Sequence, residues 1–292
     1  MEDDRDWGPK PFRFLNAWAS HPNFLRVVKE AWSRCVVQGW AGYKVSLKLK
    51  EVKASLKQWN KEEFGNLNDK LSLIKEQLYS LDLLQERNSL SDNDLQIKRT
   101  LKSEYWKTLR LIEITWLQKS RQIWFKEGDK NSKFFHMVAS SRQRKNSFVS
   151  LNLNRSTVED PEQIRMGVKM HFHNFFSERW PSRPKFLGSF ERKLSIDDAR
   201  RLELPFSEAE IWEAIRECDG NKAPGPDGFN MKFIKKSWPI IKEDICLFIK
   251  EFHLNSKLSK GDHCELGKRT CTMICLEGCS RSKEAEILWR IN

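Results

Sequence analysis

A basic segment with interleaved aromatic residues is the first candidate for binding chemistry. Between residues 120 and 150, seven Lys and Arg residues outnumber two carboxylates, which leaves a formal charge of +5. Lys and Arg neutralise phosphates, and exposed aromatic rings stack on unpaired bases. The alternative is that the phenylalanines are core residues and the charges form a solvated surface. The segment predicts binding of RNA or single-stranded nucleic acid through Lys126, Lys130, Lys133, Phe134, Phe135, Arg142, Arg144 and Lys145.

A loop rich in glycine and proline is the second candidate. Residues 220–228 read GNKAPGPDG, so three glycines and two prolines shape the backbone beside Lys222. Because glycine has no side chain, such a backbone can approach a phosphate closely. The Gly-Lys-Ser/Thr ending of a nucleotide-binding P-loop is missing, which excludes that class of site. We expect Lys222 to add a contact to nucleic acid, together with the loop residues Ala223, Pro224, Gly225, Pro226, Asp227 and Gly228.

Long helices must position these segments. Apolar residues recur at alternating spacings of four and three over residues 45–81, with a break at Gly65, and this repeat predicts one apolar seam on a long helix. Polar residues 88–94 interrupt the pattern, and a second apolar series runs over residues 101–123. We interpret residues 44–123 as a long antiparallel helical hairpin. The alternative is an oligomerising coiled coil that self-associates through the seam.

Shorter elements follow the hairpin. Pro161 is typical of a helix start, and Ser207 with Glu210 has the spacing of a capping box. Another helix is predicted from about residue 231 to residue 253, and weak alternation over residues 147–153 indicates a strand. The predicted fold class is mainly α (α+β overall), with a small helical segment after the hairpin.

The loop and two upstream motifs resemble one protein family. Residues 221–229 (NKAPGPDGF) resemble the beginning of the fingers of reverse transcriptases from LINE-type, non-LTR retrotransposons, and the flanks from residue 205 onward are similar to plant-type elements. Residues 128–136 look like the stretch between endonuclease and polymerase in these polyproteins. Residues 6–14 are similar to the exit from their endonuclease domain. The resemblance covers about residues 6–258 in family order.

The resemblance implies RNA-directed DNA synthesis, but its catalytic groups have no counterpart in this sequence. The family polymerase holds two metal ions with palm carboxylates, one on a strand and a pair in an aromatic-x-Asp-Asp turn. The pair most similar to that Asp-Asp turn is Asp197-Asp198, which precedes the loop. We interpret both residues as charges at the start of a helix. The family endonuclease residues would lie before Met1. We therefore expect no catalytic residue, no metal site and no polymerase activity; Mg²⁺ is expected only for an intact family polymerase.

The resemblance also sets the predicted function and domains. The chain is interpreted as a truncated reverse-transcriptase-like protein, with an incomplete fingers region, that is limited to binding RNA or single-stranded nucleic acid. The alternatives are a helical self-association protein and a decayed element with no selected function. The predicted domains are an endonuclease-exit remnant with a connecting helix (1–43), the hairpin (44–123), a basic linker region (124–180), a second linker (181–204), the start of the fingers (205–258) and a Cys-rich tail (259–292).

The tail departs from the family. It holds four of the seven cysteines, at spacings unlike those of zinc modules: Cys264, Cys271, Cys275 and Cys279. We interpret it as an out-of-frame or mis-spliced end, with a zinc site as the alternative.

The composition indicates which class of partner the protein binds and in which cellular compartment it lies. The formal net charge of +12 indicates a polyanionic partner. The acidic first residues lead into no apolar stretch, and no apolar run approaches the roughly 18 residues of a membrane span. We predict an intracellular protein of the nucleus or cytoplasm, without a signal peptide, a transmembrane segment or a membrane partner.

Overall fold

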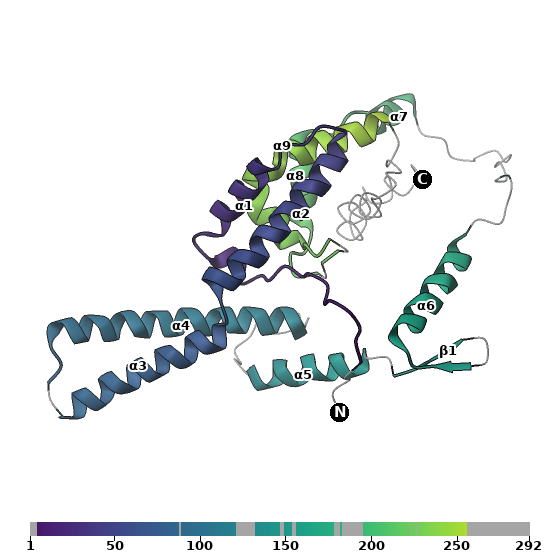
Figure 1. The fold of residues 1–292 in the computed structure, drawn as a ribbon. Coiled ribbons are helices and arrows are strands. Elements are labelled where there is room, and N and C mark those ends of the chain that lie inside the picture. Colours follow the sequence, from purple (N-terminus) through teal and green to yellow (C-terminus); the bar gives the residue numbers. More distant parts are fainter. Residues whose placement is uncertain are drawn as a thin grey trace. The chain divides into compact units, whose positions relative to one another are not determined.

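The structure, a computed structural model, is mainly helical and divides into two compact units (Figure 1). It describes residues 5–87, 89–120, 132–146, 149–153, 156–177, 182, 195–222, 224–225 and 227–255. The large unit comprises residues 12–139 and 205–292, and the small unit residues 1–11 and 140–204. In the described residues the only sheet has two strands, which confirms the mainly α class. None of the helices in these ranges is long and apolar enough to cross a membrane.

Three helices form the centre of the large unit. After a 3₁₀ turn (Trp18–Ser20), α1 (Phe24–Arg34) and α2 (Ala41–Trp59) pack against each other and against α9 (Met231–Asn255). α8 (Glu208–Glu217) packs on α9. Apolar residues at helical spacing turn one stripe of each helix into a shared core, and each large side chain buried there contributes about 1.5–3 kcal/mol. Fully buried side chains include Phe24, Val28, Val45, Val52, Leu56, Ile215, Phe233, Ile241 and Ile245.

A partly buried polar contact ties these three helices together. The Asp244 carboxylate on α9 accepts hydrogen bonds from Lys48 Nζ on α2 at 2.6 Å and from Trp32 Nε1 on α1 at 2.7 Å. The Lys48 ammonium also lies 5.3 Å from the centroid of the Trp32 ring. Because the side chains of Lys48 and Asp244 are only 18% and 22% exposed, solvent screens this ion pair less than an exposed one.

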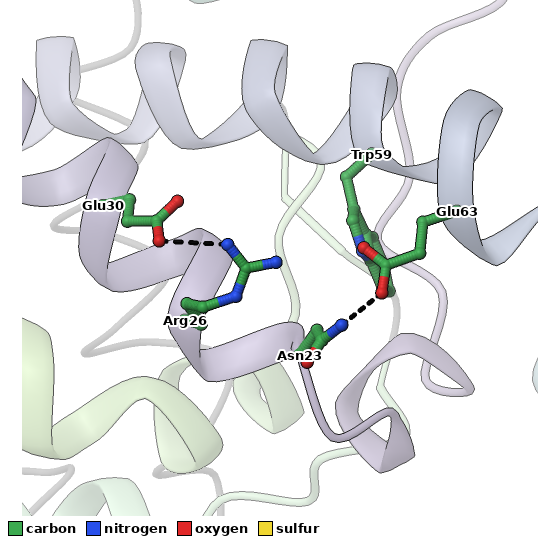
Figure 2. A network of polar contacts seen from close by, with 5 residues as sticks. All are labelled: Asn23, Arg26, Glu30, Trp59 and Glu63. Carbon is green, nitrogen blue, oxygen red and sulfur yellow. Dashed lines mark hydrogen bonds and ion pairs between the residues drawn. The ribbon is translucent and has the colours of Figure 1, made fainter.

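A second polar network holds the end of α2 (Figure 2). A π-helical turn (Asn60–Phe64) follows α2 and ends at Gly65, where φ is 68°. The Glu63 carboxylate accepts hydrogen bonds from Asn23, just before α1, and from Trp59 Nε1 at 2.7 Å. The hydrogen bond from Asn23 is the main cause that lowers the pKa of Glu63, and the bond from Trp59 acts in the same direction. The network therefore joins the start of α1 to the end of α2.

α3 (Leu67–Arg87) and α4 (Asp92–Ser120) lie side by side in the large unit (Figure 1). The buried residues of α3 are Ile74 and Leu81. The structure divides the seam that the sequence predicts as continuous: the part on α2 is buried against α1 and α9, and the part on α3 lies against α4. The π-helical turn and Gly65 interrupt the helix between the two parts, so each half meets a different partner.

The small unit contains the two strands and two helices. β1 (Leu151–Leu153) pairs antiparallel with β2 (Ser156–Val158), and α6 (Pro161–Phe176) and α7 (Ile196–Leu202) follow. Arg5 clamps the chain beside the strands, because its Nη1 donates to the carbonyls of Val149 and Glu159, each at 2.7 Å. Asp197 and Asp198 lie in the first turn of α7, as the sequence predicts.

Candidate nucleic-acid interface

The glycine- and proline-rich loop is a compact turn between α8 and α9. Gly228 N donates to Gly225 O at 2.9 Å, and Gly225 N donates to Phe229 O at 3.1 Å. The Asp227 carboxylate accepts a hydrogen bond from Phe229 N at 3.1 Å. Ala223 and Pro226 lie outside the described residues. The described part of the loop thus closes on itself through backbone groups.

Gly228 is the point where the loop meets the segment before α1. Its φ is 88°, and an added Cβ would lie 2.3 Å from Phe12 O. Phe14 N donates to Gly228 O at 2.8 Å. Only a residue without a side chain fits both this backbone conformation and this close approach. Residues 12–14 therefore hold one end of the loop.

Asn16 joins the loop to α4 and α9. Its buried side chain donates to Asn221 Oδ1 at 3.2 Å and accepts from Asn230 Nδ2 at 2.8 Å. Gln118 Oε1 on α4 accepts from Asn16 N at 2.8 Å, and Gln118 Nε2 donates to Phe14 O at 2.7 Å. The network satisfies buried polar groups that would otherwise lose their hydrogen bonds to water. It sets the loop, α4 and the start of α9 in one arrangement.

The charges at the loop have unusual surroundings. Burial raises the pKa of Asp227, although its hydrogen bond from Phe229 N and the Lys53 ammonium oppose the rise. Burial also lowers the pKa of the Lys232 ammonium, in the first turn of α9, and the charge of Arg110 on α4 lowers it further. Lys222 is exposed in the loop. The loop thus carries one exposed cation and lies beside the half-buried Lys232 of α9.

The basic segment predicted from the sequence is described only in part. Lys126 and Lys130 lie outside the described residues, and Lys133 is the second residue of α5 (Ser132–Lys145). Phe135 is buried and Phe134 is half-buried, with their ring centroids 5.9 Å apart. The last turn of α5 carries the remaining predicted cations, Arg142, Arg144 and Lys145.

Sequence reasoning missed three residues of the loop's surroundings. Asn16, Gln118 and Lys232 are scattered along the chain, and no motif marks them. Among the described residues, no group of three or more His, Cys, Asp and Glu could hold a metal ion. The Cys-rich tail lies beyond the described residues.

Comparison with known proteins finds one relative among those with curated descriptions. Over 247 residues the chain is 24% identical to the "Transposon TX1 uncharacterized 149 kDa protein" of Xenopus laevis. The match covers 80% of this chain and 18% of the frog protein, so the chain spans less than a fifth of that relative's length. No family model matches, and no solved structure matches. The chain is thus related to part of a transposon protein, and a relative from a frog gives no support to the plant-type interpretation.

Proposed function

We propose that this chain derives from a LINE-type retrotransposon reverse transcriptase and functions by binding RNA or single-stranded nucleic acid. Two observations support the origin: the similarity to a transposon protein, and the NKAPGPDGF segment that resembles the start of the polymerase fingers. The proposed role of this part of the protein is the binding part of the family's reaction.

The composition of α5 carries the binding proposal. This helix reads SKFFHMVASSRQRK, so it holds four Lys and Arg residues and no Asp or Glu. Other helices of the chain carry charges of both signs: Arg26 and Glu30 lie 3.1 Å apart on α1, and Lys70 of α3 lies 3.6 Å from Glu104 of α4. Cations that gather on a helix without carboxylates are suited to neutralise successive phosphates of a strand.

Fluorescence anisotropy with single-stranded RNA, single-stranded DNA and duplex DNA tests this function across a salt series. Each phosphate contact with a single strand contributes about −0.7 to the slope of log K against log salt, so three contacts predict about −2. The triple variant Arg142→Gln, Arg144→Gln, Lys145→Gln should weaken binding and flatten this slope.

A control variant with the same loss of charge separates the effect of a binding site on α5 from the effect of net charge. Arg26, Arg34 and Lys70 are exposed cations that each pair with a carboxylate. Replacing these three with Gln removes the same total charge, and we expect a smaller change in affinity. Equal effects of the two triple variants would refute a site on α5, and absence of binding by the unaltered chain would refute the function.

Self-association is the second candidate function. The seam residues on α2, such as Val45 and Leu56, are buried within one chain, but α3 exposes Leu73, Tyr79 and Leu84 at 56%, 65% and 52%. Sedimentation over a range of concentrations tests whether these side chains bring two copies together. The charge variants of α5 should leave such an equilibrium unchanged, whereas the substitution Tyr79→Ser with Leu84→Ser should weaken it.

A further inference from the structure

Three exposed lysines form a row along one face of α2 and the π-helical turn after it. Lys57 lies two turns after Lys50, and Lys61 follows about one turn later, so their side chains share a face. The buried residues of α2, such as Val45 and Leu56, lie on the other side of the helix. The lysine row is therefore Lys50, Lys57 and Lys61, on the side turned away from the core.

The charge of the lysine row has no partner in an ion pair. Within the described part of the chain, no carboxylate lies within ion-pair distance of these three ammonium groups. The carboxylates of neighbouring positions are engaged elsewhere. Glu51 lies 3.3 Å from Arg34 of α1, and Glu62 accepts a hydrogen bond from Gln58 at 2.9 Å. The row is thus open to an anion from outside the chain.

An aromatic ring lies at one end of the row. Tyr43 is two turns before Lys50 on the same face of α2, and it is 39% exposed. The ring of Trp40 lies beside it, with the two centroids 6.3 Å apart and the planes inclined by 35°. An exposed ring in line with cations provides a surface on which an unpaired base can stack.

Lys53 shows that the row lies close to the glycine- and proline-rich loop. This residue is on α2, one turn after Lys50, and its Nζ lies 5.3 Å from the centroid of the Phe12 ring. The same ring packs edge-on against Phe229, with 5.3 Å between centroids, and Phe12 O faces Gly228 of the loop. A strand bound along the row would therefore pass beside the segment that holds the loop.

The length and composition of this surface fit a short stretch of single strand. At 1.5 Å per residue, Lys50 and Lys61 are about 16 Å apart along the helix. A stacked strand advances about 3.4 Å per nucleotide, so about five nucleotides span the row. Ammonium groups neutralise the phosphates of any nucleic acid, but only a single strand offers an unpaired base to the ring of Tyr43.

We propose that Lys50, Lys57 and Lys61 bind the phosphates of RNA or single-stranded DNA, and that Tyr43 stacks on an unpaired base of the same strand. This inference rests on the proposed function, because it names a second contact surface for the same ligand. It shares no residue with the surface on α5, so the two surfaces can be tested separately.

Anisotropy titrations of the full chain with single-stranded RNA across a salt series test the lysine row. The triple variant Lys50→Gln, Lys57→Gln, Lys61→Gln should reduce the magnitude of the slope of log K against log salt by about 2, since each contact contributes about 0.7. At about 0.1 M salt each such contact is worth roughly a factor of five, so affinity should fall roughly a hundredfold.

Two controls accompany the triple variant. Replacing the three lysines of the row with Arg keeps the charge and should retain most of the affinity. Replacing Arg26, Arg34 and Lys70 with Gln removes the same total charge elsewhere, and its effect should be much smaller.

The stacking contact has a different signature. Tyr43→Leu should weaken the binding of single-stranded RNA roughly five- to hundredfold, the range for loss of one contact between a base and an aromatic ring. The salt slope should not change, because no phosphate contact is lost. Tyr43→Phe keeps the ring and should retain most of the affinity. Binding of duplex DNA should be the same for both variants and the unaltered chain.

Chemical acetylation of lysines, read by mass spectrometry, needs no substitution. Bound RNA should slow the acetylation of Lys50, Lys57 and Lys61 severalfold, whereas Lys75, an exposed lysine of α3, should react as before. If the triple variant fails to fold by circular dichroism, this protection decides the matter, and equal reactivity with and without RNA overturns the lysine row.

The outcomes separate the two proposals. Unaltered protein that binds RNA, with the triple variant of the row indistinguishable from its charge-matched control, overturns the lysine row and leaves the proposed function standing. Loss of duplex and single-strand binding to the same extent in the triple variant, with no effect of Tyr43→Leu, overturns the assignment to a single strand. Unaltered protein that binds no nucleic acid at low salt overturns both proposals.

Discussion

Replacing Gly228 with Ala tests whether the loop depends on its contact with the segment before α1. An added Cβ would lie 2.3 Å from Phe12 O and 2.5 Å from Phe12 Cδ1, so one segment has to move. Such a movement breaks the 2.8 Å hydrogen bond from Phe14 N to Gly228 O. It also separates the rings of Phe12 and Phe229, whose centroids lie 5.3 Å apart.

Three contributions give the expected magnitude. The backbone conformation with φ of 88° costs a residue other than glycine about 1–3 kcal/mol. The lost backbone hydrogen bond adds about 1 kcal/mol, and the disturbed aromatic pair adds about 1 kcal/mol. Gly228→Ala should therefore lower the free energy of unfolding by about 3–5 kcal/mol, a large part of the roughly 5–15 kcal/mol of a typical domain.

Urea unfolding, followed by tryptophan fluorescence and far-UV circular dichroism, measures this change. Gly65→Ala is the matched control, because Gly65 also has a positive φ, of 68°, but no atom lies within 4 Å of an added Cβ. This control carries backbone strain of about 1–3 kcal/mol without steric overlap. If the two variants destabilise the protein equally, the close approach to Phe12 contributes nothing and the reasoning is refuted.

Four further predictions concern the same unit. Asn16→Ala should lower the free energy of unfolding by about 2–3 kcal/mol, because it leaves buried partners unsatisfied; a urea midpoint equal to that of the unaltered chain would contradict this. Burial raises the pKa of Asp227, so the folded state holds this proton more tightly than the unfolded chain does. The stability that this proton contributes is therefore lost as pH rises from about 3.8 through the raised pKa. Asp227→Asn should remove this pH dependence of the free energy of unfolding, measured by urea unfolding from acidic to neutral pH. Lys48→Met and Asp244→Asn should show a coupling of about 1–2 kcal/mol in a double-mutant cycle, whereas additive effects would exclude a stabilising pair. Primer extension with Mg²⁺ should show no incorporation above background, and incorporation would mean that polymerase residues have been overlooked.

Helix starts could be predicted from the sequence because both partners of a cap lie within one turn. Ser207 and Glu210 form the predicted capping box, with Glu210 N 3.2 Å from Ser207 Oγ and Ser207 N 2.8 Å from Glu210 Oε2. Ser91 and Asp94 cap the start of α4 in the same way, with Asp94 N 3.2 Å from Ser91 Oγ. Such contacts depend on four neighbouring residues, so spacing alone reveals them.

The helices that cover the apolar face of α2 could not be predicted in this way. Spacing identified the buried faces of α2 and α3 correctly, but it joined them into one seam. Periodicity states which side of a helix is apolar, and it carries no information on which helix covers that side. The face of α2 is covered by α1 and by α9, and α9 lies far from α2 along the chain.

The surroundings of the loop were hidden for the same reason. The motif at residues 221–229 drew attention to the loop, but Asn16 and Gln118, which help to shape it, have no motif of their own. Sequence reasoning was limited in the same way for the positively charged residues. The sequence pointed to the dense run around residue 126, and it gave no sign that Lys232 of α9 lies against Gly220 of the loop.

The loop therefore owes its conformation to residues far upstream. Residues 205–255 share one core with residues 12–59, and a fragment that begins at residue 205 would lack Phe12, Phe14 and Asn16. Without them, Gly228 would lose the carbonyl group of Phe12 and the amide group of Phe14 that face it. We then expect the loop to sample many conformations, as a short flexible segment does. A loop that the core holds in place before binding avoids the ordering cost that a flexible segment would incur on contact with a strand. On the proposed function, affinity for nucleic acid should therefore fall with any substitution that releases the loop from residues 12–16, even where no cation is touched.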